Sequence, residues 1–64
     1  MKLRIRTYPH VEGDRTEVLE VTRPEQVFTP GHLVVVDGQQ VTDWDQLLGL
    51  CSGPDVKTVE RFVL

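Results

Sequence analysis

Apolar and polar residues alternate at the start of the chain. In residues 2–8, Leu3 and Ile5 fall on one side of an extended backbone, and this period of two predicts a half-buried strand. The other side of the same strand carries basic and aromatic side chains: Lys2, Arg4, Arg6 and Tyr8. One face is therefore expected to enter a core and the other to face solvent.

A second strand is predicted at residues 16–23, where valine, leucine and threonine alternate with acids. Adjacent Val18 and Leu19 interrupt the alternation and indicate a bulge. Residues 9–15 contain proline, glycine and aspartate and predict a turn. The two strands are therefore expected to form an antiparallel hairpin.

The middle of the chain predicts a connection followed by a second hairpin. Residues 24–31 (PEQVFTPG) favour one helical turn after the first proline, anchored by Val27 and Phe28. Residues 33–36 are a continuous apolar run, which predicts a strand covered on both faces. The Asp37-Gly38 pair is a strong hairpin signal, and residues 39–41 return the chain.

One helix is predicted after this hairpin, with Thr42 or Asp43 as its N-cap. Apolar residues then recur at i, i+3, i+4 and i+7 and form one stripe: Trp44, Leu47, Leu48 and Cys51. Gly53 and Pro54 end the helix.

The last segment, residues 57–64 (KTVERFVL), is rich in branched and aromatic residues and predicts a strand. A helical period also fits four apolar residues: Val56, Val59, Phe62 and Val63. The expected order is β-β-β-β-α-β, an α+β fold in which a small, mostly antiparallel sheet has one helix packed on one face. No repeat or linker is evident, so residues 1–64 are expected to form a single domain.

Composition supports a sheet and limits the stability of the domain. Eleven of the 64 residues are valine and none is alanine, which favours strands over helices. A chain of this size buries little apolar surface, and its single cysteine excludes an internal disulfide. A good minimal core, self-association or docking onto a larger partner remains as the source of stability.

The chain carries no predicted membrane span or export signal, because no apolar run approaches 18 residues and the N-terminal segment has no apolar core. With one thiol, a cytoplasmic location is expected. The net charge is −3, with three bases in the first strand and an acidic middle. This balance makes nucleic acid an unlikely general partner and suits a basic protein surface.

Residues 31–50 (GHLVVVDGQQVTDWDQLLGL) resemble the later half of a PDZ domain, especially those of bacterial membrane-linked proteases. The residues that carry the resemblance are Val36-Asp37-Gly38, Val41-Thr42, Trp44 and Leu47. The resemblance implies a hairpin-helix-strand unit over residues 31–64 and a peptide groove beside the helix. Residues 10–15 do not match the glycine-rich carboxylate-binding loop of that family, so recognition of a C-terminus is not implied.

Candidate chemistry is sparse. Cys51 lies on the apolar stripe, which predicts a buried, unreactive thiol rather than a nucleophile. His10 and His32 have no ligand at metal-binding spacing, and Asp43 and Asp45 do not share a helix face. We expect no enzyme activity, no cofactor and no metal.

The remaining candidate surfaces are edge strands and one strand face. A small open sheet leaves two edges that can accept a strand from a partner. The expected protein-binding residues are Glu17, Val18, Glu20, Thr22 and Trp44. The main hypothesis is a non-enzymatic protein-interaction module, acting as an accessory subunit, regulator or inhibitor through an acidic surface or edge strand.

Two alternatives remain open. The first is a homo-oligomer, such as a homodimer, that pairs through its edge strands. The second is a weak nucleic-acid contact through the first strand, whose candidate residues are Lys2, Arg4, Arg6 and Tyr8.

Overall fold

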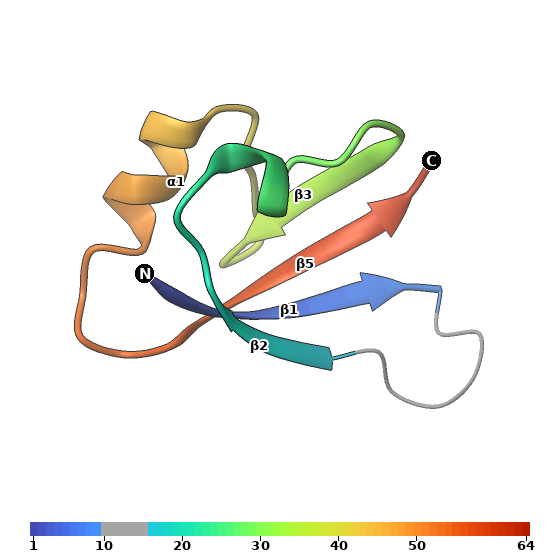
Figure 1. Ribbon diagram of the computed structural model, residues 1–64. Coiled ribbons are helices and arrows are strands. Elements are labelled where there is room, and N and C mark those ends of the chain that lie inside the picture. Colours follow the sequence, from blue (N-terminus) through green and yellow to red (C-terminus); the bar gives the residue numbers. More distant parts are fainter. Residues whose placement is uncertain (10–15) are drawn as a thin grey trace.

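The computed structural model describes residues 1–9 and 16–64 and has the predicted α+β class (Figure 1). The elements in chain order are β1 (Lys2–Tyr8), β2 (Thr16–Glu20), the 3₁₀ turn η1 (Pro24–Gln26), β3 (His32–Val36), β4 (Gln39–Gln40), α1 (Trp44–Leu50) and β5 (Lys57–Val63). The final segment is a strand, as predicted, and the helical turn after Pro24 is confirmed. Most of the expected turn over residues 9–15, including His10, lies outside the described residues.

The five strands form one mixed sheet in the order β2-β1-β5-β3-β4. β1 pairs antiparallel with β2, and β3 pairs antiparallel with both β4 and β5. β1 and β5 pair in parallel. The chain leaves β4, passes through α1 and returns to the sheet as β5. β5 is therefore the central strand.

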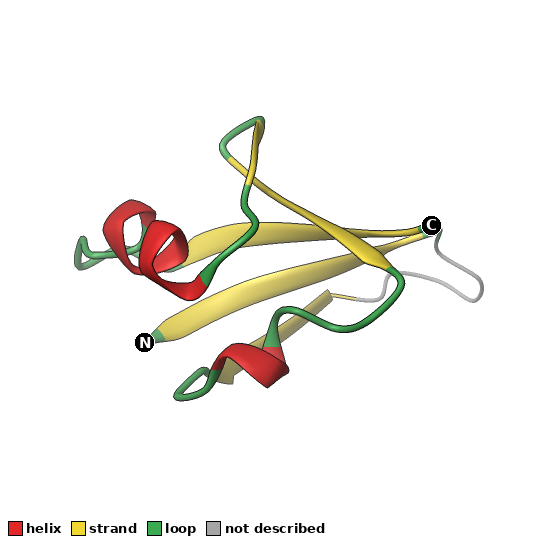
Figure 2. Cartoon of the chain, turned by 90° about the horizontal axis from the view of Figure 1, so that it is seen from above, coloured by secondary structure: helices red, strands yellow, loops and turns green. Residues whose placement is uncertain are grey.

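The core lies between the sheet and the two helical elements (Figure 2). β1 supplies Leu3 and Ile5, while Val27, directly after η1, and Leu47 of α1 have no exposed surface. The other buried apolar residues are Val21, Val34, Val36, Val41, Cys51 and Val59. The buried residues of β1, β3 and β5 share one face of the sheet, so η1 and α1 cover the same face.

Three local expectations were wrong. β3 is not covered on both faces, since Leu33 and Val35 are only half-buried on the face opposite the helices. β2 has no bulge between Val18 and Leu19, because its pairing with β1 is continuous. Leu48 is 39% exposed, because a helix of seven residues buries a narrower stripe than the spacing predicted.

The sheet contains an internal repeat that the sequence analysis missed. β1 and β3 run in opposite directions on either side of β5, so a half-turn about an axis normal to the sheet exchanges the β1–β2–η1 unit with the β3–β4–α1 unit. Residues 20–27 (EVTRPEQV) and 40–47 (QVTDWDQL) occupy equivalent places. Val21 matches Val41 in the core, and Gln26 matches Gln46 beside a sheet edge.

Candidate functional site: the open edge of β3

The β2 edge is closed at its end by the side chain of Gln26. Its Nε2 donates to the carbonyl oxygen of Glu20 at 3.4 Å, and its Oε1 accepts from the backbone amides of Thr22 at 2.6 Å and Arg23 at 2.9 Å. A carboxamide has the same donor and acceptor groups as a peptide unit. Gln26 thus occupies the position of a neighbouring strand.

Gln46 makes the same contact after β4. Its Nε2 donates to the carbonyl oxygen of Gln40 at 3.2 Å, and its Oε1 accepts from the amide of Thr42 at 3.1 Å. Asp43 caps α1 and accepts from the Gln46 amide at 2.8 Å, which holds the glutamine in the first turn of the helix. The outer edge after β4 is therefore closed like that after β2.

Among the described residues, no strand lies beside the first half of β3 on its β4 side. β4 has two residues, and these pair with Val35 and Val36. The turn before β4 is tight, with positive φ at Asp37 and Gly38 as a type I′ hairpin requires. After Val41 donates to the Val34 carbonyl oxygen at 2.9 Å, the chain leaves the sheet for α1. The edge at His32–Val34 is therefore open.

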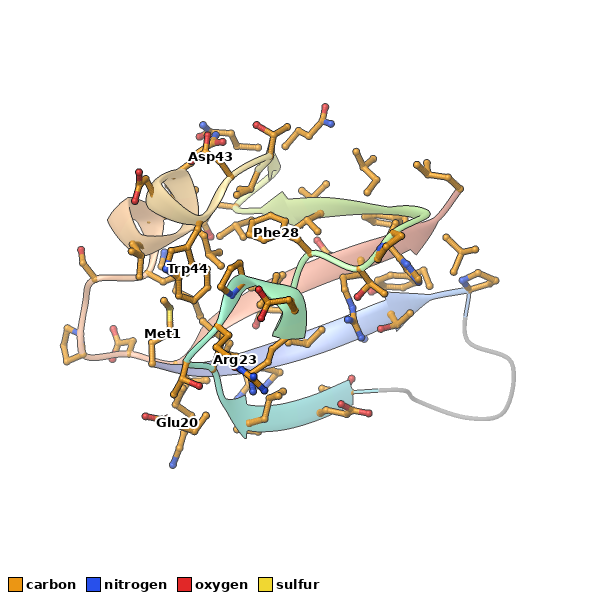
Figure 3. All side chains as sticks on the ribbon, turned by 45° about the horizontal axis from the view of Figure 1, so that its top comes forward. Met1, Glu20, Arg23, Phe28, Asp43 and Trp44 are labelled. Atoms are coloured by element: carbon orange, nitrogen blue, oxygen red, sulfur yellow. The ribbon has the colours of Figure 1, made fainter. Side chains whose placement is uncertain are left out.

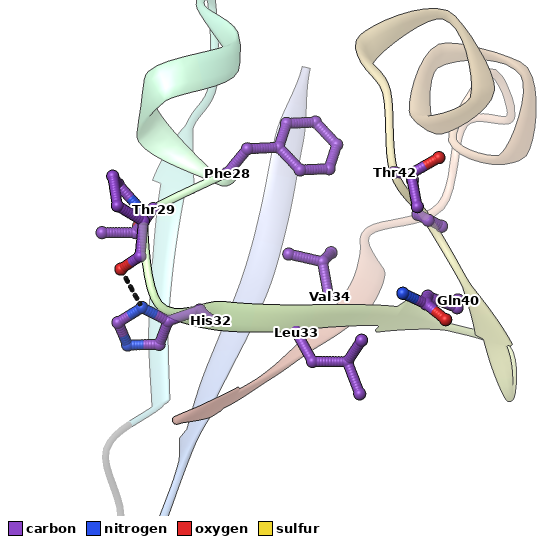
Figure 4. Close-up of a pocket in the computed structure, with 9 residues that line it drawn as sticks. Phe28, Thr29, His32, Leu33, Val34, Gln40 and Thr42 are labelled. Atoms are coloured by element: carbon purple, nitrogen blue, oxygen red, sulfur yellow. Dashed lines mark hydrogen bonds between the residues drawn. The ribbon is translucent and has the colours of Figure 1, made fainter. Parts of the chain in front are cut away.

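A pocket of about 350 Å³ lies along this open edge (Figure 4). Phe28 and Val34 point into it, and Thr42 lies on its opposite side. The residues that line it are Phe28, Thr29, Pro30, His32, Leu33, Val34, Gln40, Val41 and Thr42. None of these is an acid, a lysine or an arginine, so the pocket suits an uncharged group.

The wall formed by residues 29–32 is fixed by a tight turn. His32 donates its amide to the carbonyl oxygen of Thr29 at 3.2 Å, and Gly31 has φ +80°, as the third residue of a type II turn requires. The Thr29 hydroxyl accepts from Nη1 of Arg61 at 3.1 Å. Arg61 also donates to the Thr7 hydroxyl, so this wall is tied to β1 and β5.

None of the predicted protein-binding residues lines this pocket. Val18 and Glu20 project from β2 on the face without helices, and Val18 is 55% exposed. Glu17 is exposed on the same strand, and Thr22 donates its amide to Gln26. Trp44 is half-buried on α1 and packs against the core, as Figure 3 shows. The structure does not gather these five residues into one site.

The acids of the middle segment are spread over the described surface and several have cationic neighbours. Asp37 pairs with Lys57 at 2.7 Å, and Glu20 lies 3.6 Å from the N-terminal ammonium. Glu25 lies 4.0 Å from Arg23. Edge geometry therefore supports a binding site better than an acidic patch.

The nucleic-acid candidates lie together on the face without helices. Arg4 donates to the Thr58 hydroxyl at 3.3 Å, and the guanidinium of Arg6 lies 5.9 Å from the centre of the Tyr8 ring. Tyr8 also stacks on Phe62, with 5.0 Å between ring centres. The sequence analysis missed Phe62, because only the parallel pairing of β1 with β5 brings it beside Tyr8.

Cys51 is buried at the end of α1, and burial, the largest influence, raises the pKa of its thiol. A neutral thiol is a poor nucleophile. Residues 1–9 and 16–64 contain no cluster of three or more histidine, cysteine or acidic side chains suited to a metal ion. The same residues contain no helix that is long and apolar enough to span a membrane.

The open edge could have been found from the sequence. The Asp37-Gly38 turn and the cap at Asp43 leave room for only a very short strand between them, whereas the strand before the turn is longer. Aligning residues 20–27 with 40–47 would also have indicated the matched glutamines.

Comparison with known proteins finds no match to a family model, a curated protein or a solved structure. The hairpin-helix-strand unit that the PDZ resemblance implied is present as β3, β4, α1 and β5. The pocket lies beside β3, and residues 28–30, which lie outside this unit, complete its lining.

Proposed function

We propose that this protein is a non-enzymatic protein-interaction module that binds a segment of a partner at the open edge of β3. The observation that carries the proposal is that β4 ends beside Val35 and Val36, so the edge at His32–Val34 borders the pocket. The main-chain groups of an exposed strand edge can hydrogen-bond a partner segment, and adjacent pockets select its side chains. The accessory, regulatory or inhibitory role predicted from the sequence is consistent with such a site.

The β3 edge is a better docking site than the β2 edge. Gln26 already occupies the outward carbonyl of Glu20 and the amide of Thr22 at the end of β2, whereas the pocket that could select a side chain adjoins β3. The Gln26 contact also blocks one end of β2 for pairing with a second copy of the chain. We therefore propose a monomer whose partner is a different protein.

The test is affinity capture with the immobilised 64-residue chain and two matched variants. Thr42 lines the pocket, so Thr42→Trp places an indole in it. Thr22 is the equivalent exposed residue of the first half, so Thr22→Trp adds the same bulk away from the pocket. Proteins retained by the wild type and Thr22→Trp but lost with Thr42→Trp support the proposal. If no captured protein depends on Thr42 while both variants remain folded by circular dichroism, the proposal is rejected.

A second candidate function is contact with single-stranded nucleic acid on the face without helices. The Tyr8–Phe62 stack beside Arg6 favours it, because bases stack on aromatic rings beside cations. Fluorescence anisotropy with a labelled oligonucleotide should show binding that weakens steeply with salt and is lost in Phe62→Ala. An oligonucleotide affinity that changes neither with salt concentration nor in Phe62→Ala would exclude this function.

A further inference from the structure

One donor and one acceptor on the open edge of β3 have no partner among the described residues. The bond from Val41 to the Val34 carbonyl shows that Val34 faces the β4 side, and the alternation of an antiparallel pair places the Val34 amide and the His32 carbonyl on that side as well. The His32 amide is used by Thr29. Within residues 1–9 and 16–64, no hydrogen bond engages the Val34 amide or the His32 carbonyl oxygen.

The unpaired amide lies at a protected place. Val34 is only 3% exposed, and both Val34 and His32 line the pocket. Native structures rarely leave a buried backbone N–H without a partner. The Val34 amide is therefore a donor that a ligand in the pocket can satisfy.

The same molecule shows twice which group fits such a pair. Gln26 bridges the Glu20 carbonyl and the Thr22 amide on either side of Val21, and Gln46 bridges the Gln40 carbonyl and the Thr42 amide on either side of Val41. The free His32 carbonyl and Val34 amide flank Leu33 in the same way. We propose that this third pair binds the side-chain carboxamide of a glutamine from the partner protein.

Other occupants fit less well. A carboxylate has no donor for the His32 carbonyl, and an ammonium has no acceptor for the Val34 amide. A parallel strand would offer both groups opposite Leu33, but its next residue would meet Val41, which already bonds Val34. A side chain that enters end-on avoids Val41. Phe28, Pro30 and Val41 then offer apolar surface to the methylene groups of the glutamine.

The inference rests on the proposed function and is tested separately by NMR. The isotope-labelled chain is titrated with propionamide, which has the end group of glutamine, and with propionate and N,N-dimethylpropionamide as matched controls. Propionamide should move the Val34 amide proton in a saturable way. Both controls keep an acceptor oxygen for the Val34 amide but lack the N–H donor for the His32 carbonyl, so they should bind roughly threefold to tenfold more weakly. Thr42→Trp should abolish the Val34 shift, and Thr22→Trp should preserve it.

The outcomes separate the two proposals. Equal shifts with all three compounds, or no shift at Val34, would overturn the carboxamide assignment. If partner capture still depends on Thr42 in that case, the open edge remains a protein-binding site with a different occupant. If capture is also independent of Thr42, both proposals fail.

Discussion

The β1–β2–η1 unit and the β3–β4–α1 unit flank β5 with the same order of elements, and each has a glutamine that bonds the edge of its own hairpin. They differ in how far the outer strand extends. β2 has five residues, all paired with β1, whereas β4 has two and leaves the start of β3 uncovered. The second unit has instead a two-turn helix in place of a single 3₁₀ turn.

This difference explains where a site can form in so small a domain. In the first unit, β2 pairs with β1 from Lys2 to Arg6, and Gln26 bonds the outward groups of Glu20 and Thr22 at the end of β2. In the second unit, the early departure of the chain toward α1 leaves a pocket between β3, Phe28 and Thr42. A shortened outer strand thus produces a pocket, the candidate binding site, without any additional element.

The largest expected loss of stability comes from substitutions in the core, which test whether the two units share it. Leu47 and Val27 are equivalent, and neither has exposed surface. Leu47→Ala should lower the free energy of unfolding by about 3 kcal/mol, and Val27→Ala by about 2 kcal/mol, because each leaves a cavity. Urea denaturation followed by circular dichroism measures both.

Leu47→Met keeps the side-chain volume and should cost less than about 1.5 kcal/mol, which makes it the control for the cavity effect. If Val27→Ala leaves the denaturation midpoint unchanged, the first unit does not unfold together with the second, and the equivalence of the two units fails.

The next effect compares the two glutamines. Gln26→Ala and Gln46→Ala should each cost about 1–2 kcal/mol, since each removes bonds at both ends of a carboxamide. They should differ in self-association. Gln26→Ala frees the outward groups of Glu20 and Thr22, which lengthens the open edge of the five-residue β2, and should increase dimer formation at micromolar concentration, whereas Gln46→Ala frees groups beside a strand of only two residues.

Sedimentation velocity distinguishes these outcomes, with the wild type as the monomer reference. A Gln26→Ala variant that stays monomeric would show that the side chain does not protect the β2 edge. Dimers of the wild type would instead favour the homo-oligomer alternative.

A smaller effect concerns the starts of the two helical elements. Asp43→Ala should cost about 1 kcal/mol, because its carboxylate accepts from the Gln46 amide at the N-terminus of α1. Arg23, the equivalent residue before η1, makes no side-chain cap, so Arg23→Ala should change stability by less than about 0.5 kcal/mol. Thermal unfolding measures both, and Asp43→Asn should retain most of the cap. Equal losses of stability in Asp43→Ala and Arg23→Ala would contradict the N-cap role of Asp43.

The elements of the fold were largely predictable because they follow local rules. Alternation at Leu3 and Ile5 predicted β1, and Asp37-Gly38 predicted a turn that does have positive φ at both residues. The parallel pairing of β1 with β5 was not predictable in this way, because periodicity does not specify which strands are neighbours. The Tyr8–Phe62 stack depends on that pairing and was missed with it.

The candidate site was missed for a different reason. It consists of a backbone carbonyl of His32 and a backbone amide of Val34, which all residue types except proline can supply, so no motif marks them. What leaves them open is the length of β4, set by the positions of the turn and of Asp43. The sequence predicts binding at an edge strand but assigns it to residues 16–23 and Trp44, because the pattern does not show which backbone groups stay unpaired.

The smallest effect concerns the ion pair that ties the second hairpin to β5. Lys57 donates to Asp37 at 2.7 Å, and this hydrogen bond, together with the charge of Asp37, raises the pKa of Lys57 above its ordinary value. The folded chain then holds a proton that the unfolded chain releases at lower pH. The resulting stabilisation is fully present below the ordinary lysine pKa of about 10.4 and is lost as pH rises through the raised value.

Asp37→Asn should abolish most of this loss, because it removes the charge that raises the pKa of Lys57. Asparagine also tolerates the positive φ at this position, so the turn is kept. NMR titration of the Lys57 side chain should show its pKa falling in the variant, and urea midpoints at pH 8 and pH 11.5 should differ less than in the wild type. An unchanged Lys57 titration would mean that the second unit is joined to β5 by backbone pairing alone.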